Sequence, residues 1–253
     1  MLLPNGRGVW IPVDHGASSY PEEGLGDMES LYLSLGTVDA VIAQKGVVSH
    51  LSTFSGGPPL IAHLSVSTIH GGERSDDKIL VGSVEEAISR GAVAVSVQLN
   101  LGSVHESEMI ERMGEISEQC HRLGVPLLGM MYARGPNLQT DGDPTKGVAH
   151  AVRLGWELGC DIVKTTWTGS IESFEMVTSG VPIPVLVAGG AKLRPGQSPD
   201  LLIKVVKESL IAGGAGVCMG RNVFSHENPQ EMANTLHQLV HQQSWGQKRP
   251  PES

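Results

Sequence analysis

The segment SVEEAISRGAVAVSVQLN, residues 83–100, decides the fold class of this chain. Ser83 is a typical helix N-cap residue, and Glu86 stands three positions later, as in a capping box. Gly91 favours the end of that helix, because glycine readily adopts the backbone conformation that follows a last helical turn. The apolar run 92–100 comes next and is rich in valine, as expected of a buried strand. The segment therefore predicts a helix that leads directly into a buried strand.

The same order of helix, glycine and strand recurs along the chain. Helices are predicted over residues 28–35, 104–123, 145–158, 171–178, 199–212 and 229–241. Strands are predicted near Val9, Ala40, Leu60, Val93, Leu127, Ile162, Val185 and Val217. Apolar strands that alternate with helices indicate a parallel sheet covered on both faces. This pattern predicts an α/β fold, a (β/α)8 TIM barrel, with residues 1–243 as a single domain.

An open Rossmann-like sheet is the alternative fold. It is disfavoured because no G-x-G-x-x-G follows the first strand and no acidic partner for a ribose is evident. The polar tail, residues 244–253, is predicted to be disordered.

The composition limits the classes of function. The chain has 253 residues, 40% of them hydrophobic, and a net charge of -9. This acidic balance predicts no nucleic-acid partner and no membrane partner. The sequence has neither a signal-peptide pattern nor an apolar run as long as a membrane span, which predicts a cytoplasmic protein. Cys120, Cys160 and Cys218 lie far apart among apolar neighbours, so they are interpreted as buried thiols, with no metal site and no cofactor predicted.

Lys164 is the charged residue whose position most needs a reason. In DIVKTTWTG, residues 161–169, it follows Ile162 and Val163 and so stands at the carboxyl end of a predicted buried strand. Burial disfavours an ammonium group, which predicts a lowered pKa and an amine able to attack a carbonyl carbon. The alternative is a lysine whose head group reaches solvent from the strand end.

The carboxyl ends of barrel strands open onto one face, where residues distant in sequence meet. Those ends carry Asp14, His15, Lys45, His63, Ser65, Gln98, Asn100, Tyr132, Arg134, Lys164, Thr166, Gly189, Gly190, Gly220 and Arg221. The glycines of the last two turns, together with Arg221, predict a phosphate site for a phosphorylated small-molecule substrate. Glycines that only form tight turns are the alternative.

Imine chemistry at Lys164 also needs groups that transfer protons. Tyr132 and Asp14 are candidates for this role, although Tyr132 could be a rim residue and Asp14 could cap a helix or pair with Lys45. His15 is a candidate for orienting Asp14 or for touching the phosphate. Lys45 could compete with Lys164 for the imine.

Five motifs, in this order and spacing, resemble the archaeal-type class I aldolases, a family that also contains the bacterial DhnA-like aldolases. They are IPVDHG (11–16), MMYARG (130–135), DIVKTTWTG (161–169), PVLVAGG (184–190) and GRNVF (220–224). The resemblance implies a (β/α)8 barrel, a Schiff-base lysine at Lys164, acid and base roles for Tyr132 and Asp14, and a cyclic homo-oligomer. It also implies phosphate binding around Gly190, Gly220 and Arg221.

Within the family, VQLNLGS (97–103), GMMYARG (129–135) and TWTGSIESF (166–174) look more similar to the amino-heptulosonate synthases than to the fructose-bisphosphate aldolases. The resemblance thus implies a ketose-phosphate donor, such as dihydroxyacetone phosphate, joined to aspartate semialdehyde. The alternatives are a fructose-bisphosphate aldolase, an acetyltransferase that acts on a phosphorylated diketone, and a silent phosphosugar-binding barrel.

The chain departs from the family pattern at three places. Ala133 replaces a proline, which predicts a more mobile loop after Tyr132. Trp167 replaces a tyrosine and is expected to enlarge an aromatic wall of the acceptor pocket. The chain also begins a few residues before the first strand, without the segment that the resemblance leads us to expect over the bottom of the barrel.

Overall fold

Eight parallel strands close into a barrel in the computed structural model, which describes residues 2–193 and 199–242. The strands follow the order β1-β10-β9-β8-β7-β6-β3-β2, and β1 pairs with both β10 and β2. They are β1 (Gly8–Pro12), β2 (Ala40–Gln44), β3 (Leu60–His63), β6 (Ala94–Leu101), β7 (Leu127–Ala133), β8 (Ile162–Thr165), β9 (Val185–Ala188) and β10 (Gly216–Cys218). This closure confirms the predicted (β/α)8 barrel and excludes the open sheet.

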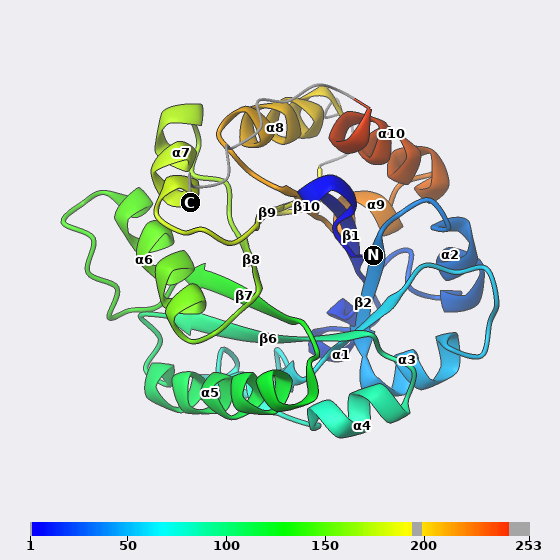
Figure 1. Ribbon diagram of the computed structural model, residues 1–253, viewed down its shortest axis with the longest axis horizontal. Coiled ribbons are helices and arrows are strands. Elements are labelled where there is room, and N and C mark those ends of the chain that lie inside the picture. The colour runs from blue at the N-terminus through cyan, green and yellow to red at the C-terminus, as the bar shows by residue number, and fades with distance from the viewer. Residues whose placement is uncertain (1, 194–198, 243–253) are drawn as a thin grey trace.

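Helices surround the barrel, as Figure 1 shows in a view along it. The outer layer comprises α2 (Met28–Ser34), α3 (Lys45–Leu51), α4 (Val84–Ser89), α5 (Glu106–Leu123), α6 (Pro144–Glu157), α7 (Ile171–Ser179), α8 (Asp200–Ile211) and α10 (Pro229–His241). Two four-residue helices, α1 (His15–Ser18) and α9 (Arg221–Phe224), follow β1 and β10 directly. These two and α3 were not expected from the sequence, and α1 and α9 are too short to show a helical period.

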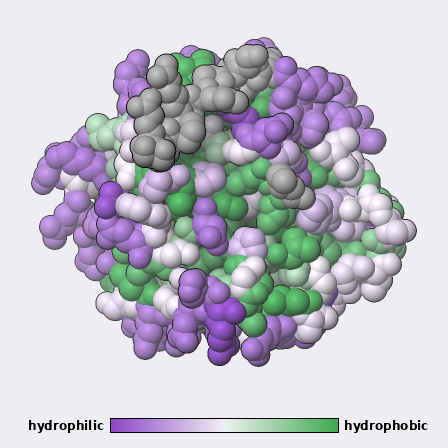
Figure 2. Space-filling view, viewed as in Figure 1, coloured by the Kyte–Doolittle hydropathy of each residue, from purple (hydrophilic) through white to green (hydrophobic). Residues whose placement is uncertain are grey.

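The side chains of the strands alternate between two apolar clusters, as the pleat of a strand requires. One cluster fills the barrel interior and includes Trp10, Ile42, Met130, Leu186 and Cys218. The other cluster lies between the strands and the helices. In Figure 2, polar side chains dominate the periphery of the face shown, and apolar side chains gather nearer its middle.

The amino-terminal residues pack against the barrel interior. Leu2 and Leu3 contact the inner cluster, and the Trp10 indole Nε1 donates a hydrogen bond to the Leu2 carbonyl over 2.9 Å. A single turn of 3-10 helix, η1 (Pro4–Gly6), links them to β1. The few residues before β1 therefore cover apolar surface inside the barrel.

Ser83 caps α4 as predicted, since its hydroxyl accepts a hydrogen bond from the Glu86 amide over 3.2 Å. The reciprocal half of the capping box is absent from the described contacts of this turn. The Glu86 carboxylate instead pairs with Lys45 and Arg90, at 3.0 and 2.8 Å.

The loop after β3 is partly ordered into a small hairpin. Strands β4 (Ser65–Val66) and β5 (Ile79–Leu80) pair antiparallel, with a 3-10 turn, η2 (Gly72–Arg74), between them. The tail predicted to be disordered, residues 244–253, lies outside the described residues. Within the described chain, no helix has the length and apolar character that crossing a membrane requires.

Candidate active site

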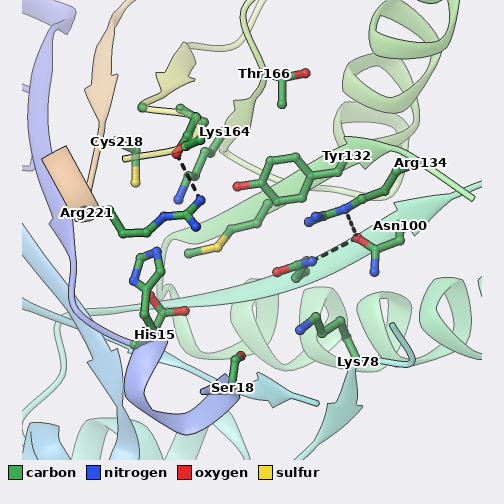
Figure 3. A pocket seen from close by; sticks show the side chains of 18 of the residues that line it. His15, Ser18, Lys78, Asn100, Tyr132, Arg134, Lys164, Thr166, Cys218 and Arg221 are labelled. Atoms are coloured by element: carbon green, nitrogen blue, oxygen red, sulfur yellow. Dashed lines mark hydrogen bonds and ion pairs between the residues drawn. The ribbon is translucent and has the colours of Figure 1, made fainter. Parts of the chain in front are cut away.

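A cavity of about 550 Å³ opens at the carboxyl ends of the strands. Figure 3 shows this cavity and the side chains that point into it. Ten residues were predicted to have a catalytic or binding role, and eight of them line the cavity: Asp14, His15, Tyr132, Lys164, Gly189, Gly190, Gly220 and Arg221. The barrel closure thus brings together residues that are separated by up to 207 positions in the sequence.

Lys164 lies on β8 and reaches into the cavity from the barrel wall. It is paired in register with Met130 of β7 and Leu186 of β9, both of which point into the inner cluster. Its side chain is 6% exposed and lies close to Tyr132 and Cys218, both of which affect its pKa. A buried, flexible amine beside a phenol and a thiol can change its protonation state without leaving the cavity.

The pKa of Lys164 differs in direction from the sequence-based expectation. Burial lowers this pKa, as predicted, but Cys218, Tyr132 and Asp14 together raise it by more, so the net shift is upward. The resting side chain is therefore an ammonium, and the expectation of a free amine was wrong. A reaction at Lys164 therefore needs a group that accepts its proton, and the groups next to it are Cys218, Tyr132 and Asp14.

Asp14 follows β1 and lies between two histidines. Its Oδ1 is 3.7 Å from Nδ1 of His15, and its Oδ2 is 3.8 Å from Nε2 of His63. Burial raises the pKa of Asp14, but His63, His15 and Lys164 lower it by more, so that this carboxyl is ionised. Burial also lowers the pKa of His63 to about 4, which makes that imidazole neutral near pH 7. The Lys164 ammonium is then a main source of charge that stabilises the Asp14 carboxylate at neutral pH.

One end of the cavity combines glycine turns with a guanidinium group. Arg221 donates a hydrogen bond to the Gly190 carbonyl over 3.0 Å, which leaves other guanidinium donors for a ligand. Gly220 has no room for a side chain, because a Cβ there would lie 2.4 Å from the Pro12 carbonyl oxygen. Gly190 has a φ of 66°, which favours glycine. These turns keep backbone close to the cavity beside a cation.

Two of the ten residues with a predicted role, Lys45 and Trp167, do not line the cavity. Lys45 begins α3, and its ammonium pairs with Glu86 of α4. Trp167 packs on Phe174 of α7, with ring centroids 5.1 Å apart, so it is not a wall of the pocket. The alternation of side chains after β8 explains this position, because Lys164 and Thr166 face the cavity and the residues between and after them face the helices.

Several cavity residues were not singled out from the sequence. Cys218, which was interpreted as a core thiol, lines the cavity and touches Lys164, whereas Cys120 and Cys160 are buried elsewhere as expected. Asp76 and Lys78 come from the loop after β3, so a search of strand ends could not find them. Within residues 2–193 and 199–242, no three His, Cys, Asp or Glu side chains form a group that could hold a metal ion.

Comparisons with known proteins agree on one family. The family model for DeoC/LacD family aldolases matches residues 9–226. The chain is 43% identical over 242 residues to the 2-amino-3,7-dideoxy-D-threo-hept-6-ulosonate synthase 1 of Archaeoglobus fulgidus, covering 95% of this chain and 88% of that protein. It is 39% identical over 234 residues to the 2-amino-4,5-dihydroxy-6-oxo-7-(phosphonooxy)heptanoate synthase of Streptomyces griseus, covering 91% and 84%.

A solved structure is also similar over nearly the whole chain. It is an archaeal fructose-1,6-bisphosphate aldolase whose catalytic lysine is covalently bound to the carbinolamine intermediate of its substrate. The TM-score is 0.83 at 30% identity, and the match covers 93% of this chain and 94% of that one. The fold and these relatives define a class I aldolase, a lyase-type enzyme that works through a Schiff base. The chain belongs to the DeoC/LacD family of aldolases.

Proposed function

We propose that Lys164 is the Schiff-base lysine and that the enzyme joins a ketose-phosphate donor to aspartate semialdehyde. The observation that carries this proposal is the position of Lys164. It is the buried amine of a cavity in which Tyr132, Cys218 and Asp14 all lie close enough to affect its pKa. A lysine that only reached for solvent from the strand end would not be 6% exposed.

The chemistry requires Lys164 to lose a proton and then attack the ketone carbon of the donor. The carbinolamine that forms loses water to give an iminium ion, with Tyr132 and Asp14 as the groups that move protons at the carbinolamine oxygen and at the donor carbon next to the iminium carbon. Removal of a proton from this adjacent carbon gives an enamine, which attacks the aldehyde carbon of the acceptor. Hydrolysis of the new iminium returns Lys164 and releases the product.

The phosphate of the donor is assigned to the end of the cavity formed by Gly189, Gly190, Gly220 and Arg221. Close backbone approach and a free guanidinium face are the features that bind a phosphate dianion. In Figure 3, Arg221 and Lys164 lie near each other on the same side of the cavity. A small ketose phosphate held at Arg221 would present its carbonyl carbon to the Lys164 amine.

The identity of the acceptor rests on the named relatives. The two synthases that are 43% and 39% identical to this chain are both named for amino-heptulosonate-type products. A seven-carbon amino sugar acid is what a three-carbon ketose phosphate and aspartate semialdehyde produce together. Fructose-bisphosphate aldolase activity is the second candidate, because the similar solved structure has that activity in its name, at 30% identity.

Borohydride trapping tests the role of Lys164. The wild-type protein is incubated with dihydroxyacetone phosphate and borohydride, and its intact mass is measured. We expect one covalent adduct per chain, no adduct in Lys164→Met, and a wild-type adduct in the control Lys146→Met, because Lys146 is an exposed residue that pairs with Asp141. No adduct in the wild type, or an equal adduct in Lys164→Met, would contradict the proposal.

The acceptor is tested with a panel of aldehydes and dihydroxyacetone phosphate as the donor. We expect a seven-carbon product with aspartate semialdehyde, identified by its mass. A product formed from glyceraldehyde 3-phosphate alone would replace this assignment with fructose-bisphosphate aldolase activity. The cyclic homo-oligomer implied by the family resemblance stays a prediction, and light scattering of the purified protein would test it.

A further inference from the structure

The cavity has a second charged end, opposite the end assigned to the donor phosphate. In Figure 3, Arg221 lies on one side of the Lys164 and Tyr132 pair, and Lys78, Arg134 and Asn100 lie on the other. Lys78, Arg134 and the nearby Asp76 all line the cavity. Arg134 lowers the pKa of Lys78, and Asp76 raises the pKa values of both Lys78 and Arg134, so the three groups are close in space.

The backbone that carries Lys78 is held firmly by its neighbour. Asp77 is 2% exposed and forms ion pairs with Arg74 and Arg112. Arg112 also donates a hydrogen bond to the Lys78 carbonyl over 3.1 Å. This anchoring fixes the chain on both sides of the Asp77 carboxylate, so Asp76 and Lys78 face the cavity from a defined position.

The Asp76 side is fixed in the same way. The Asp76 carbonyl accepts a hydrogen bond from Asn100 over 2.8 Å, and its carboxylate Oδ2 accepts one from the Ser103 hydroxyl over 2.7 Å. Asn100 Oδ1 accepts from the Arg134 Nε over 2.9 Å, and the Arg134 guanidinium stacks 4.3 Å from the Tyr132 ring centroid. The network therefore orients a carboxylate and a guanidinium beside the catalytic phenol.

The charged ends of the Lys78 and Arg134 side chains have donors that can form hydrogen bonds to a ligand. The Lys78 ammonium has no ion pair with any residue that the structure describes, and the two terminal nitrogens of Arg134 have no hydrogen bond within the same ranges. Burial lowers the pKa of Lys78, and the adjacent Arg134 lowers it further, so an incoming anion would relieve the repulsion between the two cations.

We infer that this end of the cavity binds the amino-acid end of the acceptor aldehyde. Lys78 and Arg134 take its carboxylate, and Asp76 takes its ammonium group. Two cations and one carboxylate match a ligand that carries one negative and one positive group, whereas a phosphate dianion would meet the Asp76 carboxylate. The inference rests on the proposed function, because it assigns the acceptor of that same reaction.

Three substitutions and matched acceptors test the subsite. Lys78→Gln removes one cation, Lys78→Arg keeps it, and Asp76→Asn removes the carboxylate while keeping its shape. The control is Lys146→Gln, since Lys146 is exposed, pairs with Asp141 and does not line the cavity. Succinate semialdehyde is the matched acceptor, because it is aspartate semialdehyde without the amino group.

We expect Lys78→Gln to raise the KM for aspartate semialdehyde roughly 10-fold to 100-fold, the range for loss of a charge-assisted hydrogen bond. The KM for the donor and the borohydride adduct with dihydroxyacetone phosphate should stay at wild-type values, and Lys78→Arg should recover most of the loss. Wild type should prefer aspartate semialdehyde to succinate semialdehyde, and Asp76→Asn should lose that preference. Equal KM values in Lys78→Gln and Lys146→Gln, or a wild type without the preference, would overturn the assignment.

Binding of L-homoserine separates this inference from the proposed function. Homoserine has the same ammonium and carboxylate groups but a hydroxyl in place of the aldehyde, so its binding needs no catalysis. Calorimetry should show binding to wild type and to Lys146→Gln, and at least 10-fold weaker binding to Lys78→Gln. If wild type forms no adduct with dihydroxyacetone phosphate but binds homoserine in this pattern, the proposed donor chemistry fails and the subsite stands. If homoserine does not bind, or binds Lys78→Gln equally, the subsite is refuted.

Discussion

Acidification should destabilise the protein through His63, the imidazole behind Asp14. His63 is 3% exposed, and burial lowers its pKa from the ordinary 6.5 to about 4. Its Nδ1 is 2.8 Å from the Ser96 hydroxyl, and its Nε2 is 3.3 Å from the Ser65 hydroxyl and 3.8 Å from Asp14. The folded protein therefore holds this ring neutral at a pH where the unfolded chain would protonate it.

The magnitude follows from the two pKa values. Between pH 6.5 and about pH 4, the unfolded chain binds a proton that the folded protein does not, so the free energy of unfolding falls as the pH falls. At 1.36 kcal/mol per pKa unit the full effect is about 3 kcal/mol, and about 2 kcal/mol of it is lost between pH 7 and pH 5. For a chain of this size, that change corresponds to a fall in Tm of roughly 4 to 8 °C.

Urea unfolding of wild type and His63→Gln at pH 7 and pH 5 measures the effect. His15 and His237 also have lowered pKa values and contribute to the wild-type change. The quantity to compare is therefore the change in the free energy of unfolding between pH 7 and pH 5, in wild type and in His63→Gln. We expect His63→Gln to lose about 2 kcal/mol less than wild type over this range. His150→Gln, an exposed substitution on α6, should keep the wild-type dependence. Equal pH dependence in wild type and His63→Gln would refute a neutral, buried His63.

Four other substitutions have defined outcomes. Asp77→Asn should lower the free energy of unfolding by about 3 kcal/mol in chemical denaturation, because Arg112 loses a buried anionic partner. A loss under 1 kcal/mol would contradict the anchoring of the loop by Asp77. Asp14→Asn should slow product formation by roughly 100-fold or more with an unchanged circular dichroism spectrum, whereas near wild-type rates would remove Asp14 from the proton transfers. Gly216→Ala should lower the Tm strongly, because Gly216 has a φ of 132° and a Cβ there would lie 2.0 Å from the Gly8 carbonyl oxygen. Gly114→Ala, in open space on α5, should instead raise the free energy of unfolding by about 0.5 to 1 kcal/mol.

The barrel could be predicted from the sequence because its signals are local. An apolar strand and its helix occupy one short stretch of chain, as residues 83–100 illustrate, and Ser83 caps its helix through a contact three residues away. Such signals do not depend on distant residues, so the order of strands and helices was readable without a structure. The position of Lys164 at a strand end was readable for the same reason, and barrel geometry then implied that Asp14 and Tyr132 share its face.

The environment of each group was decided by the tertiary structure, because burial, charge and contact depend on residues far apart in sequence. Lys164 has a raised pKa only because closure of the barrel places Cys218, Tyr132 and Asp14 around it. Trp167 lies outside the cavity because it packs on Phe174 of the next helix. Lys78 enters the cavity because Asp77 is anchored across the loop by Arg112 of α5, a contact over 35 positions that no sequence pattern marks.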